Sequence, residues 1–197
     1  MKIILAKSAG FCFGVRRAVE LTEQTAAKVA ESGSAAKVFT FGELIHNRDV
    51  VNRLREAGIA PIESLDEAQR GDYVIIRSHG VPKKIYEELE TRGINFIDAT
   101  CPFVSNIHRI VSAAYERGEQ VFIVGNPEHP ETIGINGHCG NSAIFIRGEE
   151  ELRKLEGRSG CLVVQTTFDS ETFAAMQRVI EREYHRIRVF NSICSTT

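Results

Sequence analysis

The chain has 197 residues, of which 43% are apolar and 25% charged, and its formal net charge is −2. This composition indicates a globular protein, because a disordered chain would hold fewer apolar residues and a collagen-like chain would hold far more than 5 Pro and 16 Gly. There is no Lys/Arg run, no apolar stretch near the ~18 residues of a membrane span and no signal peptide, so we expect a cytoplasmic protein with neither nucleic acid nor membrane as partner.

Short β-rich runs alternate with amphipathic helical runs along the chain, which is typical of an α/β protein with parallel sheets. The predicted strands are residues 2–6, 38–41, 73–77, 95–97, 120–124, 143–146, 162–165 and 188–190. The predicted helices are residues 14–31, 48–57, 83–92, 102–117 and 171–184.

Two stretches of the chain share one order of features, which indicates an internal repeat. A β-rich run ends in Gly42 in the first stretch and in Gly125 in the second, and a His follows four residues later in both, at positions 46 and 129. A later strand is followed by His79 in the first copy and by Thr166 in the second, and each copy closes with a short strand and a Cys. We therefore expect His46 to superpose on His129, and His79 on Thr166.

The repeat predicts a division of the chain into units. Residues 15–97 form the first α/β unit and residues 98–193 the second. Residues 1–14 hold an N-terminal strand and the first of the repeated cysteines, and the family resemblance described below implies that they belong with a third unit. Residues 194–197 would open that third unit, because Cys194 stands where Cys101 stands one copy earlier. We expect the chain to be a fragment of a three-unit protein that is truncated at its C-terminal side.

Five cysteines, an odd number, argue against a disulfide framework and leave reduced thiols or metal ligands as the options. Cys12 and Cys101 each precede a predicted helix, whose unpaired N–H groups and dipole stabilise a thiolate and make it a competent metal ligand. Cys194 shares this position after a strand. Cys161 precedes an apolar run and is expected to be a buried core thiol, and Cys139 a loop thiol without a role.

His46, His79, His129 and Thr166 all follow predicted strands. Open parallel sheets bind their ligands at the carboxyl ends of strands, so these side chains predict a site. For His46 or His129 taken singly, capping of a helix is an alternative of about equal weight.

Six short motifs, in order along the whole chain, closely resemble those of the LytB-type 4-hydroxy-3-methylbut-2-enyl diphosphate reductases. The motifs are Gly10-Phe11-Cys12-Phe13-Gly14-Val15, Ile45-His46-Asn47, Arg77-Ser78-His79-Gly80-Val81, Asp98-Ala99-Thr100-Cys101-Pro102, His129-Pro130-Glu131 and Gln165-Thr166-Thr167. The resemblance implies an iron-sulfur enzyme of isoprenoid biosynthesis, built as a pseudo-threefold trefoil of three α/β units around a central 4Fe-4S cluster, with the third unit mostly missing from this chain.

The resemblance also implies a role for each site residue. The ligands of three irons would be Cys12, Cys101 and Cys194, and the fourth iron would be open to the substrate hydroxyl. The diphosphate would be bound by His46, His79 and His129, whose ring nitrogens pair well with phosphate oxygens. Protons would be supplied by Glu131, while Thr166 would position the substrate and relay protons.

The implied reaction is reductive dehydroxylation of (E)-4-hydroxy-3-methylbut-2-enyl diphosphate to isopentenyl and dimethylallyl diphosphate. Because the chain has no GxGxxG nucleotide fingerprint, the electrons would come from a ferredoxin or a flavodoxin. Family members extend beyond the third cysteine and carry further diphosphate-binding residues there, so we expect this chain to be impaired. Two alternatives stay open: a zinc-dependent hydrolase that uses the three histidines with Glu131 as general base, and a non-catalytic truncated remnant.

Overall fold

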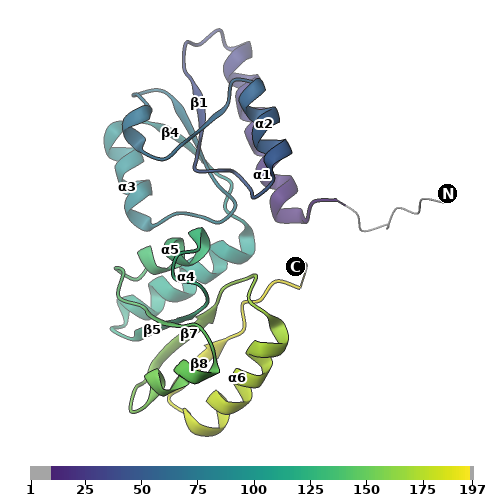
Figure 1. Ribbon diagram of the computed structural model, residues 1–197. Helices are drawn as coiled ribbons and strands as arrows, with labels where there is room; N and C mark the ends of the chain where they lie inside the picture. Colours follow the sequence, from purple (N-terminus) through teal and green to yellow (C-terminus); the bar gives the residue numbers. More distant parts are fainter. Residues whose placement is uncertain (1–9, 196–197) are drawn as a thin grey trace, which may run out of the picture.

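The computed structural model describes residues 10–195, so the strand expected at residues 2–6 lies outside the described part of the chain. The chain folds into two α/β units, one above the other in Figure 1, and each contains a four-stranded sheet in which all paired strands are parallel. The first unit consists of α1 (Phe13–Glu31), β1 (Val38–Phe41), α2 (Arg48–Glu56), β2 (Ala60–Ile62), the 3₁₀ helix η1 (Leu65–Glu67), β3 (Tyr73–Ile76), α3 (Lys83–Arg92) and β4 (Asn95–Asp98). The second consists of α4 (Pro102–Glu116), β5 (Gln120–Val124), α5 (Pro130–Gly137), β6 (Ile144–Ile146), the 3₁₀ helix η2 (Glu149–Leu155), β7 (Gly160–Val164), α6 (Ser170–Glu183) and β8 (Ile187–Phe190).

The two sheets have the same strand order. It is β2-β1-β3-β4 in the first unit and β6-β5-β7-β8 in the second, and each strand of one sheet has a counterpart in the other. The prediction of two parallel-sheet α/β units is therefore confirmed. The pseudo-threefold arrangement around a third unit stays a prediction.

The strand register corrects one of the expected superpositions. Phe41 pairs with Ile76 at the end of β1 and β3, and Val124 pairs with Val164 at the end of β5 and β7. Counted from these ends, Ser78 corresponds to Thr166. The backbone agrees, since the Cys101 N–H donates to the Ser78 carbonyl at 2.9 Å and the Cys194 N–H donates to the Thr166 carbonyl at 2.8 Å.

The expected superposition of His79 on Thr166 is therefore wrong by one residue, and His79 corresponds to Thr167. Two residues, Arg77 and Ser78, separate His79 from the end of β3, whereas only Gln165 separates Thr166 from the end of β7. His46 and His129 do match when counted from the preceding glycines. Counted from the helices, Asn47 is the counterpart of His129, because these two residues are the N-caps of α2 and α5.

Each sheet is buried between two apolar layers. In the first unit, α1 and α2 cover one face through residues such as Ala18 and Leu54, and α3 covers the other through Leu89. In the second, α6 covers one face through Phe173, and α4 covers the other through Val111. Burial on both faces explains why the strands read as continuous apolar runs rather than as alternating patterns.

Four elements were absent from the sequence prediction: the 3₁₀ helices η1 and η2, strand β2 and helix α5. Strand β2 is a short edge strand of sequence Ala-Pro-Ile, and proline is normally depleted in strands but tolerated at edges. Helix α5 has the sequence PETIGING, and its two glycines make it a poor helix by intrinsic propensity.

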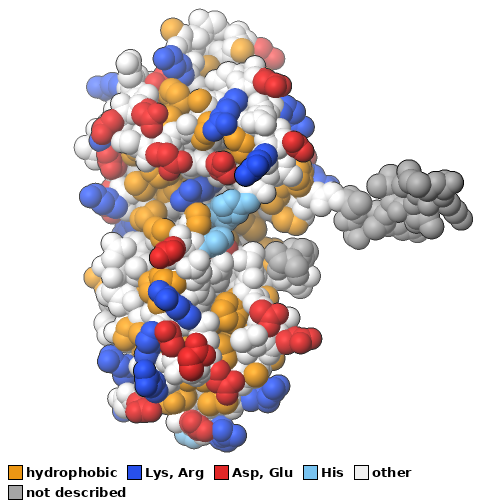
Figure 2. Space-filling model, in the orientation of Figure 1, with side chains coloured by type: hydrophobic (Ala, Val, Ile, Leu, Met, Phe, Trp, Pro, Cys, Tyr) orange, Lys and Arg blue, Asp and Glu red, His pale blue; other side chains and the backbone are white. Residues whose placement is uncertain are grey.

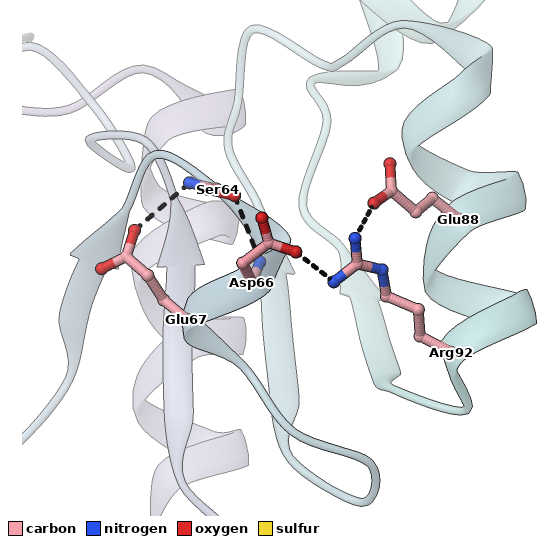
Figure 3. Close-up of polar contacts among 5 residues, drawn as sticks. All are labelled: Ser64, Asp66, Glu67, Glu88 and Arg92. Atoms are coloured by element: carbon pink, nitrogen blue, oxygen red, sulfur yellow. Dashed lines mark hydrogen bonds and ion pairs between the residues drawn. The ribbon is translucent and has the colours of Figure 1, made fainter.

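A polar network fastens η1 to α3 at the outer side of the first unit (Figure 3). Ser64 and Glu67 form a capping box, in which each side chain accepts from a backbone N–H at the start of η1. Arg92 of α3 contacts Asp66 at 2.7 Å and Glu88 at 2.5 Å. These exposed ion pairs hold the loop in place and contribute little to stability.

The segment that follows β3 packs against the second unit. In Figure 1, helices α4 and α5 of the second unit lie between the two sheets. A Cβ added at Gly80 would overlap the His108 ring of α4, and one added at Gly137 of α5 would overlap Pro82. The ring of His138 stacks on that of His108, with centroids 4.0 Å apart, and its Nε2 lies 3.1 Å from the Val81 carbonyl. These close contacts fix the segment that carries His79.

Within the described residues, no helix combines the length and the apolar character that crossing a bilayer requires.

Candidate functional site

Three histidines from both units meet at the carboxyl ends of the strands. His46 lies between β1 and α2, His79 follows β3, and His129 caps α5. The His46 and His79 ring centroids are 4.6 Å apart, and the His129 centroid lies 5.9 Å from the first and 5.5 Å from the second. One ring nitrogen of each lies within 4.8 Å of those of the others. Figure 2 shows histidine side chains gathered at the waist of the molecule.

Two of these rings are held in the neutral form. Burial above all, together with the charges of His46, Arg77 and His129, lowers the pKa of His79 to about 3. Burial, then His46 and Arg77, also lower the pKa of His129. The Glu131 N–H donates to His129 Nδ1 at 3.1 Å, so this nitrogen is an acceptor and the ring proton stands on Nε2.

His79 Nδ1 is buried and has no hydrogen-bond partner among residues 10–195. The cluster therefore offers neutral imidazole nitrogens that can donate to an anion or bind a metal ion.

A buried acid lies beside the histidines. Glu131, in the first turn of α5, is 2% exposed, and Thr166, after β7, is 6% exposed. The Thr166 N–H donates to one carboxylate oxygen of Glu131 at 2.6 Å, and the Thr166 hydroxyl donates to the other at 2.6 Å. Burial raises the pKa of Glu131, and the two bonds from Thr166 oppose part of this rise. A carboxyl with a raised pKa is suited to hold and deliver a proton near neutral pH.

Three cysteines line one cavity of about 110 Å³ beside this pair. Cys12 is the N-cap of α1 and Cys101 the N-cap of α4, and Cys194 follows β8. The walls between them include Ser78, His79, Glu131 and Thr166. Residues far apart in the sequence thus line one cavity between the two units.

Because Gly14 has no side chain, the Cys101 thiol can pack directly against the backbone of α1. A Cβ added at this position would lie 2.6 Å from Cys101 Sγ. The first turn of α1 thereby approaches the start of α4 at the cavity wall.

The pKa of Cys101 departs from the sequence expectation. Burial raises it, the N–H groups of Phe103 and Val104 lower it in part, and the thiols at Cys12 and Cys194 raise it again. The helix N-terminus therefore favours the thiolate as expected, but burial outweighs this effect.

The other two cysteines belong to the core of the second unit. Cys161 lies on β7 and Cys139 in the turn after α5, and both are fully buried in one apolar cluster. Burial raises the pKa of each thiol to about 11. The structure agrees with the core position expected for Cys161 and places Cys139 in the same core.

Sequence reasoning missed two groups near the site. Arg77 precedes Ser78 at the end of β3, and the stacked His108 and His138 lie under the segment that follows. The sequence offers a signal for Arg77, because it is the first residue after the strand that precedes His79. No sequence signal identifies the histidine pair, because its burial arises from packing between the units.

Comparisons with known proteins point to one family. The family model described as "LytB protein" matches residues 3–197. A protein of Alkaliphilus oremlandii named 4-hydroxy-3-methylbut-2-enyl diphosphate reductase is 39% identical over 100% of the chain and 69% of its own length. A protein of Clostridium perfringens with the same name is 45% identical over 99% of the chain and 68% of its own length.

Two solved structures have the same fold. The structure of (E)-4-hydroxy-3-methyl-but-2-enyl diphosphate reductase, described as the terminal enzyme of the non-mevalonate pathway, matches 98% of the chain and 68% of its own with a TM-score of 0.83 and 39% identity. The structure of the E-1-hydroxy-2-methyl-but-2-enyl-4-diphosphate reductase from Plasmodium falciparum matches 96% of the chain and 59% of its own with a TM-score of 0.86 and 25% identity.

Proposed function

The chain belongs to the LytB protein family, and from this premise we propose that it acts in the reductive dehydroxylation of (E)-4-hydroxy-3-methylbut-2-enyl diphosphate to isopentenyl and dimethylallyl diphosphate. The observation that carries the proposal is the meeting of three cysteines, three histidines and a buried acid between the two units. The first and last of these groups share one cavity, and His79 belongs to both the cavity and the histidine cluster.

The cysteines fit a 4Fe-4S cluster. Cys12, Cys101 and Cys194 line the cavity from three separate segments, so each thiol could hold a different iron. Gly14 keeps the space next to the Cys101 thiol open. When bound, the cluster would supply single electrons and one iron position without a protein thiolate.

The histidines suit the diphosphate end of the substrate. His79 and His129 are neutral at neutral pH, and His129 presents its Nε2 proton away from the helix that it caps. Such N–H groups donate to phosphate oxygens. In our proposal, His46 completes this set from the exposed side.

Glu131 and Thr166 suit proton delivery. The leaving hydroxyl needs a proton, and the buried Glu131 carboxyl holds one more readily than an exposed acid because its pKa is raised. The Thr166 hydroxyl lies 2.6 Å from this carboxyl and can pass the proton on while it orients the substrate.

The electrons would come from a ferredoxin or a flavodoxin, because the sequence holds no nucleotide fingerprint of its own. We place the reaction in the cytoplasm, where thiols stay reduced.

A zinc hydrolase is the competing assignment. Three histidine nitrogens within 4.8 Å of one another would also suit a zinc ion. That assignment leaves the cysteine-lined cavity unused.

Anaerobic reconstitution with iron and sulfide tests the proposal. We expect brown protein with near-equal iron and sulfide, loss of the colour in Cys12→Ser or Cys101→Ser, and no loss in the matched controls Cys139→Ser and Cys161→Ser. Addition of the allylic diphosphate should then change the spectrum. Zinc binding without iron or sulfide, or a cluster that depends on Cys139 while Cys12 is dispensable, would contradict it.

A further inference from the structure

Arg77 stands directly after β3, at the same end of the sheet as the histidines. Its guanidinium lies against Gly42, the residue after β1, where an added Cβ would overlap Nη1. In the second unit, Gln165 packs in the same way against Gly125, with the added Cβ 2.8 Å from its side chain. Both units therefore use a glycine to admit a long polar side chain, but only the first unit places a charge there.

The Arg77 guanidinium forms no hydrogen bond or ion pair within the part of the chain that the structure describes. Its Nε is buried without a hydrogen bond, and none of the ion pairs among residues 10–195 includes this guanidinium. Burial lowers the pKa of Arg77, and the charge of Glu63 raises it in part. A half-buried guanidinium whose Nε donates to no acceptor is unfavourable, whereas an anion with several oxygens would satisfy it.

The charge of Arg77 acts on the histidine cluster. It lowers the pKa of both His79 and His129, so the guanidinium lies within electrostatic range of two of the three rings. The site thus combines one permanent cation with neutral N–H donors. This combination favours an anion over a metal ion, because a cation among the rings would be repelled.

We propose that Arg77 is a further diphosphate-binding residue, whose guanidinium donates to phosphate oxygens of the group held by His46, His79 and His129. This inference rests on the proposed function, because it takes the histidine cluster as the diphosphate site. Arg77 supplies a charge that persists at neutral pH, and the rings of His79 and His129, which are neutral there, supply direction.

Titration calorimetry with inorganic pyrophosphate tests the proposal on the whole chain. Arg77→Met should weaken binding about ten- to a hundredfold, the loss typical of a hydrogen bond to a charged group. Arg77→Lys should recover part of the affinity because it restores the charge but not the planar fork. The matched control is Arg70→Met, since Arg70 precedes β3 and packs its stem on Gly93, and it should bind as the unchanged chain does.

Two further measurements separate the possible failures. Urea unfolding of each variant tests whether Arg77 has only a packing role against Gly42. In that case Arg77→Met would lower the free energy of unfolding and leave the pyrophosphate affinity unchanged. His46→Ala, a change at an exposed ring, reports on the histidine site itself. If His46→Ala loses affinity and Arg77→Met does not, the role of Arg77 is overturned alone. If the unchanged chain binds no pyrophosphate, the diphosphate site of the proposed function fails, and Arg77 with it.

Discussion

At the scale of single residues, the Glu131 carboxyl is the group whose replacement separates chemistry from binding. Glu131→Gln keeps the volume and the bond from the Thr166 N–H, but it removes the acidic proton of the carboxyl. We expect the rate of product formation to fall roughly 10²- to 10⁴-fold, the usual loss of a general acid, while substrate binding persists. A spectroscopic binding titration and a rate on the same variant measure both effects.

The control for this change is Glu128→Gln, three residues earlier and exposed. Glu128→Gln should alter neither the rate of product formation nor substrate binding. An unchanged rate in Glu131→Gln at saturating substrate would remove Glu131 from the mechanism.

A second residue makes stability depend on pH. Burial, aided by the neighbouring His138, lowers the pKa of His108 to about 3, from an ordinary value of 6.5. Because the unfolded chain takes up a proton that the folded chain excludes, stability is full above about pH 6.5 and falls as the pH drops towards 3. Between about pH 7.5 and about pH 5 the loss from this residue is about 2 kcal/mol.

Urea unfolding at the two pH values measures the loss. His108→Gln should lose about 2 kcal/mol less than the unchanged chain over this interval, since it has no proton to gain. The exposed His185→Gln should lose as much as the unchanged chain does. An equal loss in His108→Gln would show that the buried ring is not the source.

At the scale of elements, the starts of α1 and α4 form one structural feature. Gly14→Ala would place a Cβ 2.6 Å from Cys101 Sγ and displace this thiol. Since Ala favours helix over Gly by about 1 kcal/mol, α1 itself should not be weakened. We expect less iron after reconstitution with no fall in the melting temperature. Glu20→Ala, on the exposed face of the same helix, should load fully, and a normal iron content in Gly14→Ala would contradict the expected displacement.

The elements also show what the sequence can predict and what it cannot. Apolar runs rich in β-branched residues, such as Val121–Val124, predict a strand buried on both faces without any tertiary information. Helix α5 cannot be predicted in this way, because Gly134 and Gly137 are unfavourable for a helix, and Gly137 is required by a close contact with Pro82 of the first unit that the local sequence does not reveal. The β2 edge strand is too short to produce a pattern.

The same division holds for the site. Cys101 and His129 were found from the sequence because residues that follow strands or precede helices are recognisable by position. The unpaired guanidinium of Arg77 and the buried ring of His108 were not, since solvent exclusion depends on segments far away in the chain. The pairing of His79 with Thr166 is wrong by one residue, because the exact end of a strand is not visible in the sequence: β3 ends at Ile76 and β7 at Val164.

At the scale of the whole molecule, the site is shared between the units. His46 and His79 come from the first, and His129, Glu131 and Thr166 from the second. The segment after β3 holds the two halves together through Gly80, which faces His108 of α4. Contacts between the units therefore set the geometry of the histidine cluster.

Gly80→Ala tests this role of the interface. Gly80 has φ +72° and faces His108, whereas Gly118 has φ +73° with nothing within 4 Å of an added Cβ. Alanine at either position suffers about 1–2 kcal/mol of left-handed strain, and at Gly80 a further 1–3 kcal/mol from overpacking. We expect Gly80→Ala to unfold at lower urea and to bind pyrophosphate more weakly than Gly118→Ala. Equal behaviour of the two variants would show that the interface does not control the site.

Thr166 joins two parts of the molecule through its own backbone. Its N–H and hydroxyl donate to Glu131, and its carbonyl accepts from the Cys194 N–H. A change at this position disturbs the acid and the cysteine segment together. The effects of Thr166→Val and Glu131→Gln on the rate of product formation should therefore not be additive in a double-mutant cycle. The coupling energy between the two changes, and not the loss of rate in either single variant, is the quantity that reports on proton transfer.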